Sequence, residues 1–176
     1  MKIIATLSFL LASVSCFSQT GSGEKWIRMV KQEYAIQAPV TWSIDSSKQM
    51  GTDLVVFSML ENGNDRFRDN VNVLIHNVAG MNIDLARYTS ISTGRIKQMA
   101  PDSRIEESKT ITTKKGAFQK IMYTATQGGF KLRFEQYYFI TGKKAYAVTL
   151  TTEADKFETF RPVGEAILNS FELTGR

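Results

Sequence analysis

The chain has 176 residues, a formal net charge of +5 at pH 7, one histidine and one cysteine. That length fits one ordinary domain, which can bury a core without metal or disulfide support. A single cysteine excludes an intrachain disulfide, and a single histidine leaves no second imidazole to share a metal ion. The cations are spread out apart from Lys114-Lys115 and Lys143-Lys144, so we expect no nucleic-acid partner.

The first 18 residues have the layout of a secretory signal peptide. Lys2 supplies a positive charge, residues 3–14 form an apolar stretch, and small residues follow. The apolar stretch is shorter than the roughly 20 residues that a membrane-spanning helix needs. Because Cys16 and Ser18 are the small residues at positions −3 and −1, we expect cleavage after Ser18, with residues 1–18 removed. The exported protein would then be periplasmic or extracellular and would contain no cysteine.

Cys16 permits a second interpretation. A cysteine that follows an apolar signal can instead be lipidated, and the protein would then be anchored in the envelope. The preceding Ser13-Val14-Ser15 is a poor version of that signal, since leucine is usual three residues before the cysteine. Contact with a membrane is expected only if Cys16 carries a lipid.

The first half of the mature chain predicts four strands. Residues 19–24 are small and polar and predict a flexible leader, after which residues 25–174 are expected to form a single domain. The strands, of which the first two form a hairpin, are residues 26–30, 34–38, 53–60 and 70–78. The third is apolar on both alternating faces, so both faces of its sheet need cover.

The second half predicts a meander of four antiparallel strands. Between Phe130 and Ile140 apolar side chains alternate with charged ones, and a period of two is typical of a strand. Short glycine-containing turns connect this strand to its neighbours, and such turns join antiparallel strands. The four strands are residues 105–112, 118–125, 130–140 and 145–151.

Two helices can cover this sheet. Asp84 is a good N-cap for a helix over residues 85–99. An apolar stripe with helical spacing lies between residues 157 and 171, but Pro162 is tolerated only in a first turn. We therefore expect the second helix to begin near Phe160 or Arg161, and a short strand to follow at residues 172–173. The predicted fold class is α+β, with a central antiparallel sheet of about six to eight strands and helices on both faces.

Five short segments resemble, in the same order, elements of PsbP-like and DcrB-like domains. They are spread over residues 33–173, which is nearly the whole mature chain. The segments are Tyr34-Ala35-Ile36-Gln37-Ala38-Pro39-Val40-Thr41-Trp42, Asp69-Asn70-Val71-Asn72-Val73, Asp84-Leu85 with Tyr88, Lys144-Ala145-Tyr146, and Ile167-Leu168-Asn169-Ser170-Phe171. The resemblance implies a central antiparallel sheet between two helical layers, an α/β/α sandwich.

The same resemblance implies a function through binding. PsbP proteins are extrinsic assembly and stabilising subunits of photosystem II, DcrB-like proteins are exported envelope proteins, and a nuclear relative binds the GTPase Ran. A shared fold is only an associational argument for function. The manganese and calcium associated with PsbP proteins map to no residue of this sequence, so we expect no metal and no cofactor.

His76 is the residue on which a Ser-His-Asp site or a metal site would have to be centred. A lone strand histidine is more often structural than catalytic. The sequence has neither an HExxH motif nor an aspartate-rich calcium loop. We therefore predict no catalytic residue, and we keep a hydrolase around His76 as the weakest hypothesis.

Two surfaces are candidates for binding a partner protein. The polar loop at residues 61–69 carries Arg66, Phe67 and Arg68, and arginine and aromatic residues are the usual anchors of protein interfaces. The alternative is a mobile, solvated loop. Tyr137 and Phe139 lie on the charged face of their strand, where either a helix covers them or they form an exposed patch.

Our leading hypothesis is an exported, non-catalytic accessory protein that docks on an envelope or secreted partner. The second hypothesis is a carrier of a small apolar ligand or lipid. The carrier needs a cavity between sheet and helix, lined by residues such as Phe57, Phe118, Tyr138 and Phe171.

Overall fold

The computed structural model describes residues 24–48 and 51–174. Cys16, the predicted cleavage site and most of the predicted leader lie outside these residues. Within the described part of the chain, neither helix is long and apolar enough to cross a membrane.

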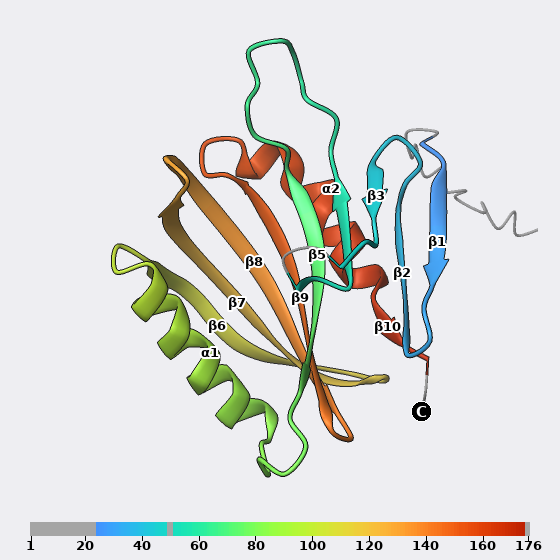
Figure 1. The fold of residues 1–176 in the computed structure, drawn as a ribbon, viewed down its shortest axis with the longest axis vertical. Helices are drawn as coiled ribbons and strands as arrows, with labels where there is room; N and C mark the ends of the chain where they lie inside the picture. Colours follow the sequence, from blue (N-terminus) through green and yellow to red (C-terminus); the bar gives the residue numbers. More distant parts are fainter. Residues whose placement is uncertain (1–23, 49–50, 175–176) are drawn as a thin grey trace, which may run out of the picture.

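A seven-stranded antiparallel sheet forms the centre of the molecule (Figure 1). Its strand order is β3-β4-β5-β9-β8-β7-β6. The strands are β3 (Ser43–Asp45), β4 (Leu54–Phe57), β5 (Asn70–Asn77), β6 (Arg104–Thr113), β7 (Gly116–Gln127), β8 (Phe130–Thr141) and β9 (Lys144–Glu153). The last four form the predicted meander. Gly128 and Gly129 both have positive φ, as the two-residue turn between β7 and β8 requires.

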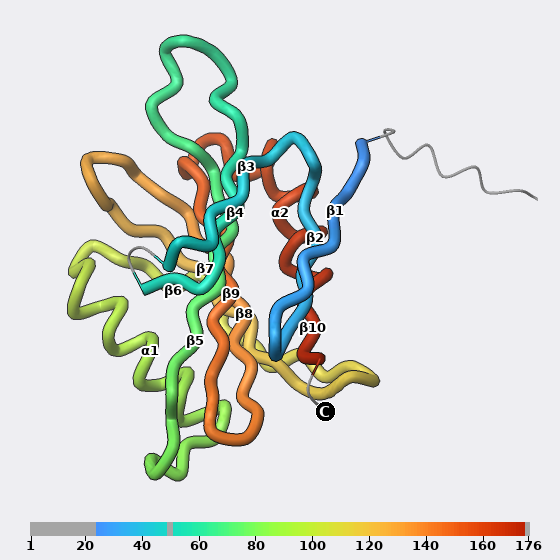
Figure 2. Tube along the Cα trace, turned by 45° about the vertical axis from the view of Figure 1, so that its right-hand side comes forward, coloured from blue at the N-terminus to red at the C-terminus, as the bar shows by residue number. Residues whose placement is uncertain are grey.

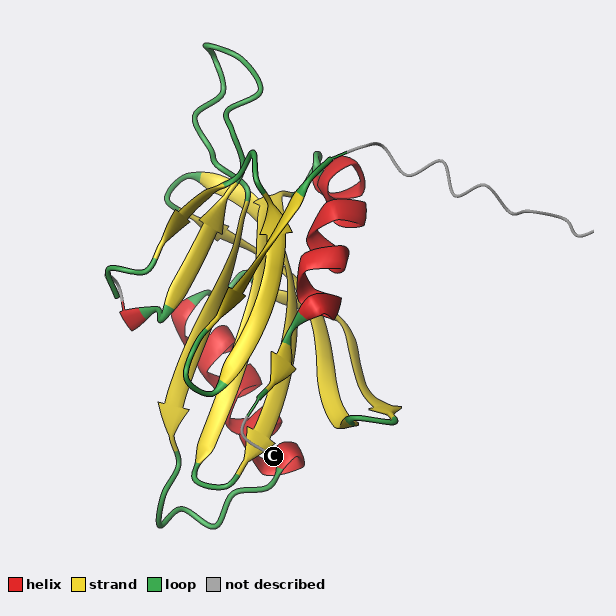
Figure 3. Ribbon diagram, turned by 90° about the vertical axis from the view of Figure 1, so that its right-hand side faces the viewer, coloured by secondary structure: helices red, strands yellow, loops and turns green. Residues whose placement is uncertain are grey.

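Helices cover both faces of this sheet (Figures 2 and 3). The helix α1 (Leu85–Met99) packs against β7 and β8, and the side chain of Asp84 caps it by accepting a hydrogen bond from the Arg87 backbone at 2.7 Å. The helix α2 (Phe157–Ser170) packs on the opposite face, against β9 and β5. The predicted fold class is therefore confirmed.

A separate three-stranded sheet lies beside α2 (Figure 2). It consists of β1 (Trp26–Val30), β2 (Tyr34–Pro39) and β10 (Glu172–Leu173), with β2 in the middle. The predicted hairpin and terminal strand thus exist, and they pair with each other instead of joining the main sheet. Tyr34, Ile36 and Ala38 of β2 are buried in the core that α2 also contributes to. This second sheet therefore extends the cover on the α2 face.

The expected start of the second helix was wrong, because α2 begins at Phe157. The Phe157 side chain is fully buried, and the Arg133 guanidinium lies 4.5 Å from the centre of its ring. The backbone of Phe160 bonds to the Lys156 carbonyl at 3.2 Å, so the first turn closes before Pro162. Burial of Phe157 thus favours an extra turn although Pro162 lacks the N–H that the helix interior uses.

One strand is clearly shorter than expected, and one strand was not predicted. The strand expected at residues 53–60 is ordered as β4 only over Leu54–Phe57, because the chain then leaves the sheet into the loop that ends at Asp69. The short edge strand β3 was not predicted, since three residues carry too little alternation to recognise.

Candidate functional site

A mostly apolar groove lies at the C-terminal end of α2. The β6–β7 hairpin curls away from the main sheet, and its tip reaches past this end of the helix (Figures 1 and 2). Between them is a groove of ≈ 860 Å³. Its apolar lining comes from β7, β8, the end of α2, and the chain that follows α2: Phe118, Tyr137, Phe139, Leu168, Phe171 and Leu173.

Aromatic rings in mutual contact form the floor of this groove. The Phe118 ring centre lies 4.6 Å from that of Tyr137 and 5.2 Å from that of Phe139. The Phe139 ring in turn lies 4.9 Å from Phe171, which stacks on Tyr34 at 5.3 Å. Tyr137 and Phe171 are buried, whereas Phe118 and Phe139 are half-buried. The groove therefore presents two partly exposed phenylalanines on a packed aromatic base.

The strand register explains why these rings meet. Tyr137 and Phe139 are two residues apart on β8 and so point to the same face. The pairing of Gln119 with Tyr138 places Phe118 beside them on β7. This is the face that α2 covers, and the Tyr137 hydroxyl donates to Asn169 Oδ1 of α2 at 3.3 Å.

A buried ion pair lies next to this aromatic base, beneath α2. Lys120 Nζ lies 2.6 Å from Glu135 Oε1 and 3.2 Å from Glu165 Oε1 of the helix. Burial raises the pKa of Glu135, and the hydrogen bond and charge of Lys120 act in the opposite direction. The same ammonium lies 5.9 Å from the Tyr137 ring centre. The charge of Glu135 on β8 is thus compensated inside the protein.

The rim of the groove is cationic. Lys114 and Lys115 form the turn of the β6–β7 hairpin, and Lys115 Nζ lies 3.1 Å from Glu172 Oε2. Hydrogen bonds from Arg28 and Lys115 lower the pKa of Glu172, so this carboxylate stays ionised at neutral pH. Lys114 and Lys115 thus give this rim two cations against the single carboxylate of Glu172, and an apolar ligand that carries negative charge would meet favourable electrostatics.

The predicted anchors of the 61–69 loop lie elsewhere. The Phe67 ring is 5.3 Å from that of Phe130 and joins the core on the α1 face. Arg68 donates to the Ser58 carbonyl at 2.8 Å, and its guanidinium lies 5.2 Å from the Phe57 ring centre. Arg66 is exposed. Of the three predicted anchors, two therefore make contacts within the protein itself.

The structure separates the two predicted binding surfaces. Tyr137 and Phe139 line the groove on the α2 face, and Phe67 packs on the α1 face. Tyr137 is only 4% exposed, so an α2-side layer covers it, while Phe139 stays open to the groove. Whether these five residues contact a partner remains a prediction.

Sequence reasoning missed the groove as a unit. It named Phe118 and Phe171 as lining a ligand cavity, and both do line the groove. It grouped them with Tyr138, which packs on the α1 face, and with Phe57, which lies under Arg68. The alternation of side chains along a strand could have separated them. Tyr138 lies between Tyr137 and Phe139 on β8, so its side chain points to the opposite face of the sheet.

His76 has a phenol as its hydrogen-bond partner. Its Nδ1 lies 2.6 Å from the Tyr88 hydroxyl of α1. Burial, and then the charge of Arg95, lower the pKa of His76, so the ring is neutral at pH 7. Within residues 24–48 and 51–174, no three His, Cys, Asp or Glu side chains gather closely enough to hold a metal ion. The contacts of His76 thus supply neither the serine nor the carboxylate that the hydrolase hypothesis needs.

Comparison with solved structures identifies the fold. The solution structure of cyanobacterial PsbP, CyanoP, from Synechocystis sp. PCC 6803 superposes with a TM-score of 0.66. The match covers 92% of this chain and 98% of CyanoP, at 15% sequence identity. The chain has the PsbP-like fold. The resemblance seen in the five sequence segments is thereby confirmed in three dimensions.

Two further PsbP-like structures are similar. One is PA94 of Pseudomonas aeruginosa, a protein of unknown function described as a putative regulator, with a TM-score of 0.58 and 14% identity over 82% of this chain and 94% of PA94. The other is LpqN of Mycobacterium tuberculosis, described as involved in cell envelope biogenesis, with a TM-score of 0.59 and 12% identity over 87% of this chain and 92% of LpqN. No protein-family model and no curated protein match the chain.

Proposed function

We propose that the protein is an exported, non-catalytic accessory protein whose groove binds an apolar segment of an envelope or secreted partner. The observation that carries this proposal is the pair of half-buried rings, Phe118 and Phe139, on the buried base of Tyr137 and Phe171. Aromatic residues, phenylalanine among them, are enriched in the buried core of protein interfaces, where they bury a large apolar area.

The packing of the floor supports a binding role. Phe171 is held between Tyr34 and Phe139, and the Tyr137 hydroxyl is fixed by Asn169. A site whose side chains are already ordered loses little conformational entropy when a partner binds. The groove thus presents a surface that is formed before binding.

A protein with the same fold and the N-terminal sequence of this chain both support a role in the cell envelope. LpqN, which has the same fold, is described as involved in cell envelope biogenesis. The first 18 residues of this chain have the layout of an export signal. Both observations agree with a partner outside the cytoplasm.

Affinity purification from envelope extracts of the source cells tests the proposal. The bait would be the tagged mature chain, its Phe139→Ala variant and, as a matched control, Phe67→Ala. Phe67 is also a half-buried phenylalanine, but it lies on the α1 face. We expect Phe139→Ala to reduce recovery of the partner at least about tenfold and Phe67→Ala to leave it unchanged.

The opposite pattern would reject the groove as the binding site. Equal recovery with Phe139→Ala, or loss only with Phe67→Ala, would assign partner binding to another surface. Circular dichroism of each bait must show the same folded state, so that lost recovery is not lost folding.

A small apolar ligand is the second candidate occupant. The groove volume of ≈ 860 Å³ lies within the roughly 300–1,000 Å³ that is usual for small-molecule sites. Organic extraction of the purified protein followed by mass spectrometry distinguishes the two candidates. A stoichiometric apolar compound that is absent from purified Phe139→Ala would favour the carrier, and an extract free of such a compound would favour the protein partner.

A further inference from the structure

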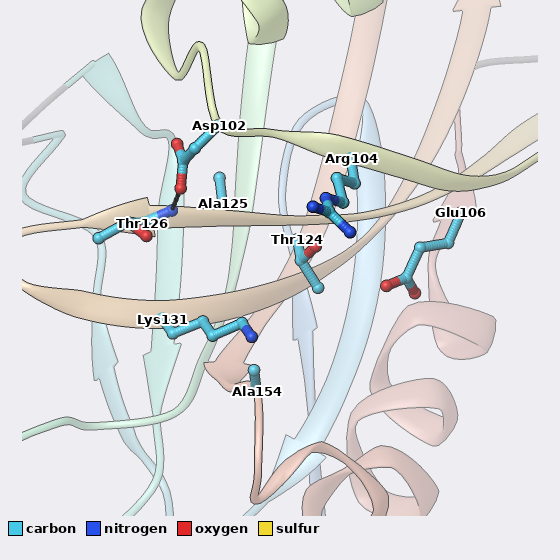
Figure 4. A pocket seen from close by; sticks show the side chains of 8 residues that line it. All are labelled: Asp102, Arg104, Glu106, Thr124, Ala125, Thr126, Lys131 and Ala154. Carbon is cyan, nitrogen blue, oxygen red and sulfur yellow. Dashed lines mark hydrogen bonds between the residues drawn. The ribbon is translucent and has the colours of Figure 1, made fainter.

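A second pocket lies on the same face of the main sheet, next to the chain that enters α2. It has a volume of ≈ 460 Å³ and is shown in Figure 4. Its lining is polar, unlike that of the groove: Asp102, Arg104, Glu106, Thr124, Ala125, Thr126, Lys131 and Ala154.

The strand register brings these side chains together. Arg104 on β6 pairs with Thr124 on β7, and Thr126 pairs with Lys131 on β8. Lys131 belongs to the same alternating set as Tyr137, which places it on the α2 face. The Ala154 backbone bonds to the Lys131 carbonyl at 2.9 Å and so brings the chain before α2 to the edge of the pocket.

The two carboxylates of the pocket are already engaged. Asp102 Oδ2 accepts a hydrogen bond from the Thr126 backbone at 2.9 Å, and the hydrogen bonds of Thr126 lower the pKa of Asp102. Glu106 Oε2 lies 2.7 Å from Nη2 of Arg133. The charge of Glu106 is thus balanced by Arg133, whereas Asp102 is held by an uncharged backbone N–H and forms no ion pair with Arg104 or Lys131.

The two lining cations have no such partner. Among the residues that the structure describes, Arg104 and Lys131 make no ion pair. Figure 4 shows the guanidinium and the ammonium turned toward the same space, on either side of Thr124. Two cations without an ion-pair partner converge beside a threonine, and they create a positive electrostatic potential that favours binding of an anion.

We propose that this pocket binds the phosphate or carboxylate group of a small anionic ligand. Arg104 would supply the two parallel N–H donors that suit a planar or tetrahedral oxyanion, Lys131 a point charge, and Thr124 a hydroxyl donor. The volume leaves room for an organic group attached to the anion. This site is independent of the groove, since the two pockets share no lining residue.

An NMR titration with inorganic phosphate tests this site directly. The ¹H–¹⁵N spectrum of the mature chain would be followed at constant ionic strength, with sodium chloride replacing phosphate. We expect saturable shifts centred on Thr124, Thr126 and Lys131. The double variant Arg104→Gln/Lys131→Gln should weaken binding at least about tenfold, because two charge-assisted contacts are lost.

A matched double variant on α1 serves as the control. Arg87→Gln/Lys97→Gln removes two exposed cations as well and should leave the phosphate affinity unchanged. Titration with succinate extends the test to carboxylates. Sedimentation with phosphatidylglycerol and phosphatidylcholine vesicles tests a lipid headgroup as the source of the phosphate.

The outcomes of these experiments distinguish a free anion, a lipid headgroup and the absence of an anion site. Saturable binding of phosphate or succinate that depends on Arg104 and Lys131 supports a free anion as the ligand. Binding to phosphatidylglycerol vesicles alone, with the same dependence, supports a lipid headgroup. Absence of saturable binding to any of these probes, or binding that the Arg104→Gln/Lys131→Gln variant retains, would overturn the proposal.

Discussion

The ammonium of Lys120 lies 2.6 Å from Oε1 of Glu135, in the interior beneath α2. Their side chains are 8% and 0% exposed, and Glu165 of the helix joins them from 3.2 Å. The pair therefore connects β7 and β8 to α2, next to the ring of Tyr137. Removing one partner of a buried pair costs far more than replacing both, because the remaining charge is left without compensation.

Replacement of Lys120 alone is therefore expected to be severe. Lys120→Met should lower the free energy of unfolding by about 3–5 kcal/mol, since Glu135 stays buried without its countercharge. The double variant Lys120→Met/Glu135→Leu should recover most of this loss. Urea unfolding at neutral pH measures both, and a double variant as unstable as Lys120→Met would contradict this account of the pair.

The close approach of α2 to β9 gives a second prediction. A Cβ atom at Gly164 would lie 2.5 Å from Leu150 Cδ2, whereas one at Gly94 on α1 would meet nothing within 4 Å. Gly164→Ala should destabilise the protein by about 1–3 kcal/mol through overpacking. Gly94→Ala should stabilise it by up to about 1 kcal/mol, because alanine is the better helix former.

Thermal unfolding of the two alanine variants compares these effects under identical conditions. Adding Leu150→Ala to Gly164→Ala should relieve the overlap, so the two changes should be less than additive. A Gly164→Ala variant as stable as Gly94→Ala would show that α2 does not pack against Leu150 as described.

The helices and strands were predicted well where the local sequence pattern and the packing in the folded protein favour the same structure. The helix α1 was predicted at its observed bounds because Asp84 caps it and a periodic stripe follows. The start of α2 was missed because burial of Phe157 outweighs the local signal of Pro162. Such a tertiary effect has no signature within a window of neighbouring residues.

The binding surface was harder to predict than the fold. Phe118, Phe139 and Phe171 come from three elements, and only the curl of the β6–β7 hairpin and the end of α2 leave a groove between them. Phe67, an aromatic residue between two arginines in a polar loop, was the more conspicuous candidate in the sequence. In the structure its ring packs on Phe130.

Asp69 gives the protein a specific pH dependence. Its side chain is almost fully buried, and hydrogen bonds from the backbone at Asp69 and Glu153 only partly offset the effect of burial on its pKa. Burial raises its pKa to about 6. The folded state therefore holds this proton more tightly than the unfolded chain, and the contribution to stability is greatest below about pH 4 and is lost as the pH rises through about 6.

The variant Asp69→Asn isolates this contribution. Its free energy of unfolding relative to the parent protein should rise by about 2–3 kcal/mol between about pH 4 and about pH 7.5, because the amide never ionises. Urea unfolding across that range measures the difference. Parallel curves for the two proteins would show that Asp69 titrates normally.

Photo-crosslinking from the groove is the most direct test of the proposed function. The crosslinker p-benzoylphenylalanine would replace Ala117, an exposed residue that lines the groove, and in separate chains Arg66 on the loop and Lys97 on α1. We predict a discrete protein adduct in the envelope fraction from position 117, lost when Phe139→Ala is added, and none from positions 66 and 97. An adduct from position 66 alone, or one from position 117 that persists with Phe139→Ala, would contradict partner binding in the groove.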